Sequence, residues 1–221
     1  MHRIRVWDLP TRLFHWALAL AVLGLVVTAN LGGNWMVWHM QLGYSVFALL
    51  LFRLVWGFVG GHWSRFAHFV YGPGQVLRYI RGQGDQTQAV GHSPLGALSV
   101  FALLFILSAQ VGTGLFSDDE IAFFGPLVSL VSSDTVALLT WYHKNIGKPA
   151  LILLVVLHIL AVLYYRFVKR SDLIGAMIGG DKLLDRHTQN SADSPRERLL
   201  AVLVLAFCVT AVWWVTGLGT T

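Results

Sequence analysis

Five stretches of this chain are long and apolar enough to cross a lipid bilayer as helices, which takes about 20 residues each. They lie at residues 12–30, 39–59, 95–116, 143–168 and 199–217. Hydrophobic residues make up 56% of the chain and charged residues 12%, about half the charged fraction of a soluble domain. Since the five stretches leave little sequence for a separate soluble domain, we predict an all-α integral membrane protein.

The chain has one cysteine, Cys208, in the middle of the last predicted span. A single cysteine excludes a disulfide framework, a cysteine-ligated iron–sulfur cluster and a covalent CxxCH haem site within the chain. The sequence contains no nucleophile–base pair and no phosphate-binding loop, so we predict no catalytic residue.

Basic residues are distributed unequally over the connections, and this distribution predicts the orientation. The N-terminal segment, the connection at 60–94 and the connection after the fourth span carry most of the lysines and arginines. The loop at 117–142 has four carboxylates and no basic residue. We therefore predict a cytoplasmic N-terminus and, after five spans, a periplasmic C-terminus. The same membrane-flanking charges account for the net charge of +5, so nucleic-acid binding is not predicted.

Four histidines lie near the ends of the predicted spans, namely His15, His39, His143 and His158. An imidazole near the bilayer is costly and needs a partner. His143 and His158 are fifteen residues apart, which in a helix separates them by about 22 Å in height and about 60° in azimuth. Both rings are therefore expected to face one interior at two depths, although Pro149 is expected to kink this span.

The predicted orientation sorts these histidines into two pairs, His15 with His158 toward the inner side and His39 with His143 toward the outer side. Two histidines fill both axial positions of a haem iron, and such a centre passes electrons. Zinc is the competing metal, but it usually takes three or four ligands in one cluster. A third interpretation is that the histidines simply lie at the membrane interface.

Two arginines are candidates to contact a haem. Arg12 lies three residues before His15, on the same helical face. Arg53 lies within the second predicted span, where it needs a fixed anion such as a haem propionate. The alternative for Arg53 is that its guanidinium reaches the lipid headgroups along the membrane edge. The aromatic segment around residues 62–80 is predicted to include a short amphipathic helix on the membrane surface.

Several motifs together resemble the bacterial cytochrome b561 family, which includes the cytochrome b subunit of nickel–iron hydrogenases. The first helix has Arg12-Leu-Phe-His15-Trp16, and the second has His39-x-x-x-Gly43 followed by Arg53-Leu-x-Trp56. The third has Gly91-His-Ser-Pro-Leu-Gly96 and then Thr113-Gly-Leu-Phe116, and the fourth has His143 and His158. The resemblance covers roughly residues 5–180.

The resemblance implies a four-helix transmembrane bundle that holds two non-covalent b-type haems on the four matching histidines. It also implies electron transfer in the bacterial inner membrane between quinone and a periplasmic redox protein, such as a c-type cytochrome or a hydrogenase-like subunit. We divide the chain into a dihaem cytochrome b domain at 1–180, a polar linker at 181–198, and an additional transmembrane helix and tail at 199–221. The sequence leaves a homodimer open.

An enzyme that acts alone is the alternative function, because some small family members resemble a superoxide:quinone oxidoreductase. Lys144 and Lys148, on the predicted outer side, could attract a small anion. The nearby Asp118, Asp119 and Glu120 would repel an anion and suit a basic protein. The acidic loop therefore favours a protein partner.

Overall fold

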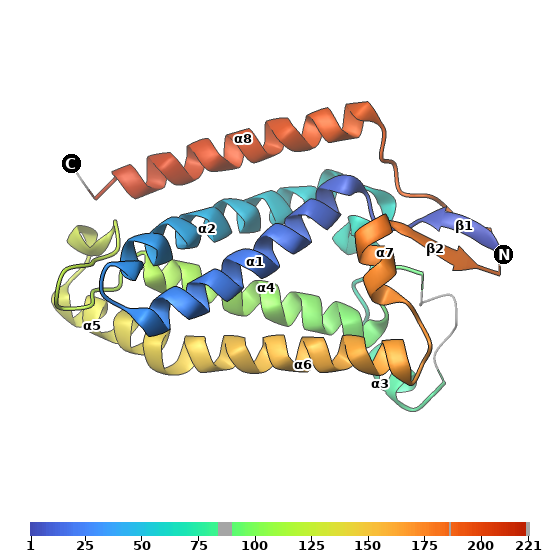
Figure 1. The fold of residues 1–221 in the computed structure, drawn as a ribbon, viewed down its shortest axis with the longest axis horizontal. Helices are drawn as coiled ribbons and strands as arrows, with labels where there is room; N and C mark the ends of the chain where they lie inside the picture. Colours follow the sequence, from blue (N-terminus) through green and yellow to red (C-terminus); the bar gives the residue numbers. More distant parts are fainter. Residues whose placement is uncertain (84–89, 186, 220–221) are drawn as a thin grey trace. The chain divides into compact units, whose positions relative to one another are not determined.

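The computed structural model describes residues 1–83, 90–185 and 187–219, and it confirms an all-α membrane protein. Within these described ranges, five helices are long and apolar enough to cross a membrane. Their bounds are α1 (Leu9–Leu31), α2 (Trp35–Val59), α4 (Pro94–Gly114), a continuous run from α5 (Ser133–Tyr142) to α6 (Lys148–Phe167), and α8 (Pro195–Gly217) (Figure 1). The predicted connection at 60–94, linker at 181–198 and tail at 199–221 each include residues outside the described ranges.

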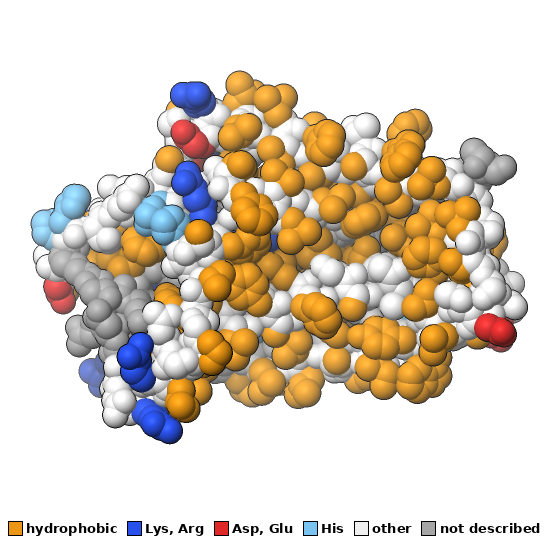
Figure 2. All heavy atoms as spheres, turned by 180° about the vertical axis from the view of Figure 1, so that it is seen from behind, with side chains coloured by type: hydrophobic (Ala, Val, Ile, Leu, Met, Phe, Trp, Pro, Cys, Tyr) orange, Lys and Arg blue, Asp and Glu red, His pale blue; other side chains and the backbone are white. Residues whose placement is uncertain are grey.

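The chain divides into two compact units, and each long helix contributes to both. The first unit comprises Met1–Phe14, Arg53–Ala102 and Leu154–Val204. The second unit comprises His15–Phe52, Leu103–Leu153 and Leu205–Thr221. Hydrophobic side chains dominate the face drawn in Figure 2, as expected where helices meet lipid.

The first two long helices are joined by a tight turn in the second unit. Gly32 and Gly33 both adopt positive φ angles, 65° and 54°, in the left-handed region that glycine enters without steric cost. The N–H of Gly32 donates to the carbonyl of Thr28 at 3.0 Å. This turn lets α2 begin at Trp35, earlier than the sequence predicted, and places His39 one turn into the helix.

The fourth span begins ten residues earlier than predicted, because α5 occupies part of the predicted loop at 117–142. Ser132 caps this helix by accepting from the N–H of Thr135 at 3.3 Å, and Asp134 lies in the first turn, where a carboxylate is favourable. Between α5 and α6 the backbone forms a π-helical turn, η5 (His143–Gly147). Pro149 lacks an N–H for the regular ladder, and π turns accommodate such interruptions.

The first unit has a two-stranded sheet that the sequence analysis did not predict. Strand β1 (His2–Arg5) pairs antiparallel with β2 (Asp181–Leu184). The short helix α7 (Leu173–Gly179) leads into β2 and lies beside it (Figure 1). A small core of Ile4, Val6, Trp7, Val90 and Ala176 lies under these elements. The start of the predicted polar linker is therefore a strand.

Ion pairs join residues of the predicted linker at 181–198 to the N-terminal segment. Arg5 donates to Asp181 at 2.5 Å and to Asp193 at 2.8 Å. Asp193 also accepts from Arg198 at 3.0 Å. Burial alone would raise the pKa of Asp181, but hydrogen bonds from Arg3 and Arg5 outweigh burial and lower it. Helix α8 then starts at Pro195, where Glu197 and Ser194 form a capping pair.

Short elements connect α2 and α4 in the first unit. Among the described residues of this connection they include the 3₁₀ turns η1 (His62–Ser64) and η2 (Phe66–His68) and the helix α3 (Pro73–Ile80). A helix therefore exists in the segment where the sequence predicted one. A further 3₁₀ turn, η4 (Val128–Leu130), precedes α5 in the second unit.

Candidate functional site

His39 and His143 face each other in the second unit. His39 lies on α2 and His143 at the start of the π turn between α5 and α6. Their ring centroids are 6.3 Å apart, and the ring planes meet at 86°. The structure thus brings together the outer pair that the sequence predicted.

The two imidazoles make the same pair of contacts, each with one backbone carbonyl group and one threonine hydroxyl group of a neighbouring helix. Nδ1 of His39 lies 3.1 Å from the Leu25 carbonyl oxygen and 3.4 Å from the Thr28 hydroxyl of α1. Nδ1 of His143 lies 3.0 Å from the Gln110 carbonyl oxygen and 3.2 Å from the Thr113 hydroxyl of α4. In both cases the threonine follows the carbonyl residue by three positions, on the same helical face.

Each threonine is itself oriented by its own helix. Thr28 donates to the Gly24 carbonyl oxygen and Thr113 to the Ala109 carbonyl oxygen, both at 2.7 Å. A backbone carbonyl beside Nδ1 can only accept, so Nδ1 carries the proton in both histidines. The Nε2 lone pairs are consequently available to a metal, which is the usual tautomer of a metal-bound histidine.

The distance between these rings is compatible with both imidazoles holding one haem iron. A metal–imidazole bond is about 2.0 Å long and the ring centroid lies about 1.1 Å behind the nitrogen, so two axial imidazoles have centroids about 6.2 Å apart. The observed separation is 6.3 Å. Among the described residues no group of three or more His, Cys, Asp or Glu could hold a metal, as the zinc interpretation would require.

Glycines shape the space around this pair. A Cβ atom at Gly43, one turn after His39, would meet nothing within 4 Å. At Gly114 a Cβ atom would lie 3.1 Å from Cε1 of His143, which is tight. At Gly147 it would collide with the Gln110 side chain. The absence of side chains at Gly114 and Gly147 therefore allows α4 to approach the π turn closely.

His15 and His158 belong to different compact units. His158 is half-buried on α6, with Nδ1 at 3.4 Å from the Ser99 hydroxyl of α4 in the first unit. His15 is half-buried on α1, and its ring lies edge-on to Trp16, with centroids 5.1 Å apart. Their pairing stays a prediction.

Arg53 is buried in the first unit, with only 3% of its surface exposed. Its Nη2 donates to the Ser64 carbonyl oxygen at 3.0 Å, and its guanidinium stacks over the Phe66 ring at 4.6 Å. Nη1 is buried and has no hydrogen-bond partner among the described residues. Since the side chain is enclosed, it does not extend to lipid headgroups, and the orphaned nitrogen is compatible with an anionic group.

Arg12 makes its contacts with the segment around α7. Its Nη1 donates to the Ile178 carbonyl oxygen at 2.6 Å, and its Nη2 lies 4.0 Å from Asp193. A role for Arg12 toward a haem stays a prediction.

Asp8 is a buried residue that the sequence analysis missed. Its carboxylate accepts hydrogen bonds from the Trp56 indole at 3.2 Å and the Ser64 hydroxyl at 2.7 Å, and from backbone N–H groups. It also caps α1 through the Thr11 N–H at 2.8 Å. An aspartate directly before an apolar helix containing Pro10 near its start is a helix N-cap signal, which could have identified it.

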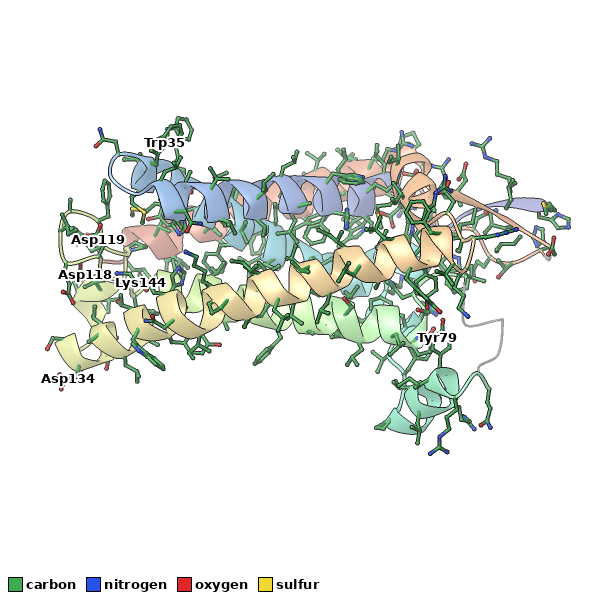
Figure 3. All side chains as sticks on the ribbon, turned by 60° about the horizontal axis from the view of Figure 1, so that its bottom comes forward. Trp35, Tyr79, Asp118, Asp119, Asp134 and Lys144 are labelled. Carbon is green, nitrogen blue, oxygen red and sulfur yellow. The ribbon has the colours of Figure 1, made fainter. Side chains whose placement is uncertain are left out.

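The acidic loop before α5 has a defined conformation in the second unit. Asp119 accepts from the backbone N–H groups of Ile121, Ala122 and Phe123, each at 2.9 Å. Burial would raise the pKa of Asp119, but these hydrogen bonds and the charge of Lys144 outweigh it and lower the pKa. Asp118, Asp119 and Lys144 are labelled toward the same end of the helices in Figure 3. Lys148 donates to Asn30 at 2.9 Å.

A family model described as prokaryotic cytochrome b561 matches residues 6–180. The chain belongs to the prokaryotic cytochrome b561 family. The predicted resemblance is thereby confirmed. Membership in this family makes the chain a b-type cytochrome, which implies haem b and electron transfer in a membrane.

Curated relatives agree with the cytochrome b561 assignment. The chain is similar to three proteins, each named probable Ni/Fe-hydrogenase B-type cytochrome subunit. It is 27% identical to the one from Bradyrhizobium diazoefficiens, over 81% of this chain and 85% of that protein. The corresponding values are 26%, 80% and 87% for Azotobacter vinelandii, and 25%, 79% and 85% for Cupriavidus necator. No solved structure matches the chain.

Proposed function

We propose that this cytochrome b561 binds two b-type haems and transfers electrons across the bacterial inner membrane between the quinone pool and a periplasmic redox protein. The observation that carries the proposal is the pair of His39 and His143, whose rings lie at the separation of two axial ligands and whose Nδ1 atoms are engaged in the same way.

His39 and His143 would hold the outer haem, which supplies a reversible one-electron centre when bound. Because His39 and His143 would both bind the haem iron, the site would be suited to electron transfer and not to the binding of oxygen or substrate. The Leu25 and Gln110 carbonyl groups fix the tautomer and increase the electron donation of each imidazole. The surrounding apolar helices exclude water and thereby tune the potential.

His15 and His158 would hold the inner haem. His158 lies fifteen residues after His143 in the same α5–α6 run, which corresponds to about 22 Å along regular helix. Two centres at these heights could pass electrons from one side of the membrane to the other. In this arrangement Arg12 and Arg53 would neutralise haem propionates, and the buried Nη1 atom of Arg53 is the stronger candidate donor.

Hydrogenase-like proteins are the partner class that the relatives favour, because the names of those relatives place them in Ni/Fe-hydrogenase systems. A c-type cytochrome is the second candidate. The acidic loop would face the periplasm if the N-terminus is cytoplasmic, as the basic flanks indicate. Lys148 donates to Asn30, and the negative charge of Asp119 acts near Lys144, which gives less support to an enzyme that attracts superoxide.

The haem content and spin state of the purified chain test this proposal. We expect two b-type haems per chain, low-spin in both oxidation states, with two steps in a redox titration. His158→Ala should remove one haem and leave the spectrum of the His39/His143 centre. His68→Ala, a change at an exposed histidine of η2, is the matched control and should retain both. One haem per wild-type chain, or a high-spin spectrum, would contradict the proposal.

A further inference from the structure

A cavity of about 410 Å³ lies in the first unit, where α2 ends and α8 begins. Its wall has a charged part and an apolar part. The charged part is formed by Arg65, Arg196 and Glu197, and the apolar part by Val59, Leu200 and Leu203 among others. The haem sites proposed above use none of these residues.

The charged part of the cavity is cationic overall. Arg65 is held in place because its Nε donates to the Gly60 carbonyl oxygen at 2.8 Å. Glu197 is engaged at the start of α8, where it accepts hydrogen bonds from the N–H and the hydroxyl of Ser194. Two guanidinium groups and one engaged carboxylate leave a net positive charge, and guanidinium groups bind phosphate through paired hydrogen bonds.

The apolar part continues along the same side of α8. Arg196, Leu200 and Leu203 are spaced by four and three residues, so they lie on one helical face. This face proceeds from a cation at the helix start to leucines deeper in a candidate membrane span. Leu203 is 59% exposed in the structure, so it has contact area left for another molecule.

We propose that this cavity binds one phospholipid with an anionic headgroup. Its phosphate would contact Arg65 and Arg196, and an acyl chain would follow Leu200 and Leu203. The order of charge and apolar surface matches the order of headgroup and acyl chain in a lipid, and basic pockets between transmembrane helices are known binding sites for anionic lipids. A soluble phosphate would make no apolar contact with the leucine side chains. The bound lipid would join α8 to the end of α2.

Native mass spectrometry of the full-length chain in detergent tests this proposal. The protein is titrated with phosphatidylglycerol and, separately, with phosphatidylcholine of the same acyl chains. We expect the anionic lipid to bind about tenfold more tightly to the wild type, which is the size of effect that one charge-assisted contact supplies. Glycerol 3-phosphate, which has the phosphate without the acyl chains, should not compete at equal concentration.

Arginine variants locate the site. Arg65→Gln together with Arg196→Gln should abolish the preference for phosphatidylglycerol, while Arg65→Lys with Arg196→Lys should keep most of it. Arg81→Gln removes an exposed arginine outside the cavity and should behave as wild type. Helical circular dichroism checks that each variant is folded, and the lysine variants preserve the test if the glutamine variants do not fold. Equal binding of the two lipids, an unchanged preference in the glutamine variants, or effective competition by glycerol 3-phosphate would overturn the proposal.

Discussion

Under the proposed function, replacement of Gly114 by alanine should perturb the haem assigned to His39 and His143 and leave the second proposed haem unchanged. A Cβ atom at this position would lie 3.1 Å from Cε1 and 3.5 Å from Nδ1 of His143. Ordinary contacts between carbon atoms lie at about 3.5–4.0 Å, so the imidazole must move by several tenths of an ångström. The Gln110 carbonyl group resists that movement, and an iron ion bound to His143 under the proposed function would resist it too.

Gly112 provides a matched control on the same helix. A Cβ atom at Gly112 would meet nothing within 4 Å. Both substitutions replace a glycine in the last turn of α4 by alanine, so they restrict the backbone of the unfolded chain to a similar extent. The difference between the two variants therefore isolates the contact with His143. Overpacking of this kind costs about 1–3 kcal/mol, which corresponds to a loss of about fivefold to a hundredfold in haem affinity if the whole cost falls on the haem-bound state.

The assay is haem retention during dilution in detergent, followed by pyridine haemochrome analysis and a redox titration. Gly114→Ala should lose one haem at least several-fold faster than wild type, or shift the midpoint potential of one haem. Gly112→Ala should match the wild type in both measurements. If Gly114→Ala keeps both haems with unchanged midpoints, the ring of His143 is not held as the structure shows.

Three further predictions concern other parts of the chain. The pKa values of Asp181 and Asp193 are lowered in the folded state, so these carboxylates stabilise the fold above their ordinary pKa of 3.8, and their contribution is lost as the pH falls below it. Acid unfolding followed by circular dichroism should therefore depend less on pH below about 4 in Asp181→Asn. An unchanged dependence would argue against this network. Ending the chain after Asp193 should leave both haem spectra intact. Ending it at residue 180 should reduce the yield of folded protein, because this truncation removes the partner of β1 and the ion pairs of Arg5. Equal yields of the two truncated proteins would contradict that reasoning. Changing Asp118, Asp119 and Glu120 to their amides should slow electron exchange with a basic partner at low salt and less so at high salt. If the variant and the wild type have identical stopped-flow rates at both salt concentrations, the loop is not part of the docking surface.

The transmembrane helices were predictable because hydropathy and length identify a membrane span without knowledge of its neighbours. The start of α5 was not predicted, since Ser132, Ser133 and Asp134 are typical of loops as well as of helix N-termini. The pairing of β1 with β2 joins segments about 180 residues apart, and nothing local in either segment indicates the other.

The candidate site also has features that were predictable from the sequence and features that were not. Histidine spacing and charge distribution predicted which histidines pair at the outer level, and the structure brings His39 and His143 together. The contacts of each imidazole with a carbonyl group and a threonine depend on the rotation of α1 and α4 about their axes. Residue spacing along the chain does not determine that rotation. Asp8 was overlooked although its N-cap position was visible in the sequence.

The most direct test of the central claim is the electron paramagnetic resonance spectrum of the oxidised protein, recorded for wild type, His39→Ala and His143→Ala. The two imidazole planes meet at 86°, and perpendicular axial imidazoles give a low-spin ferric signal with one very large g value. We predict that the wild type shows such a signal and that both variants lose that same signal while the second low-spin signal remains. Loss of different signals in the two variants would show that His39 and His143 do not bind the same iron.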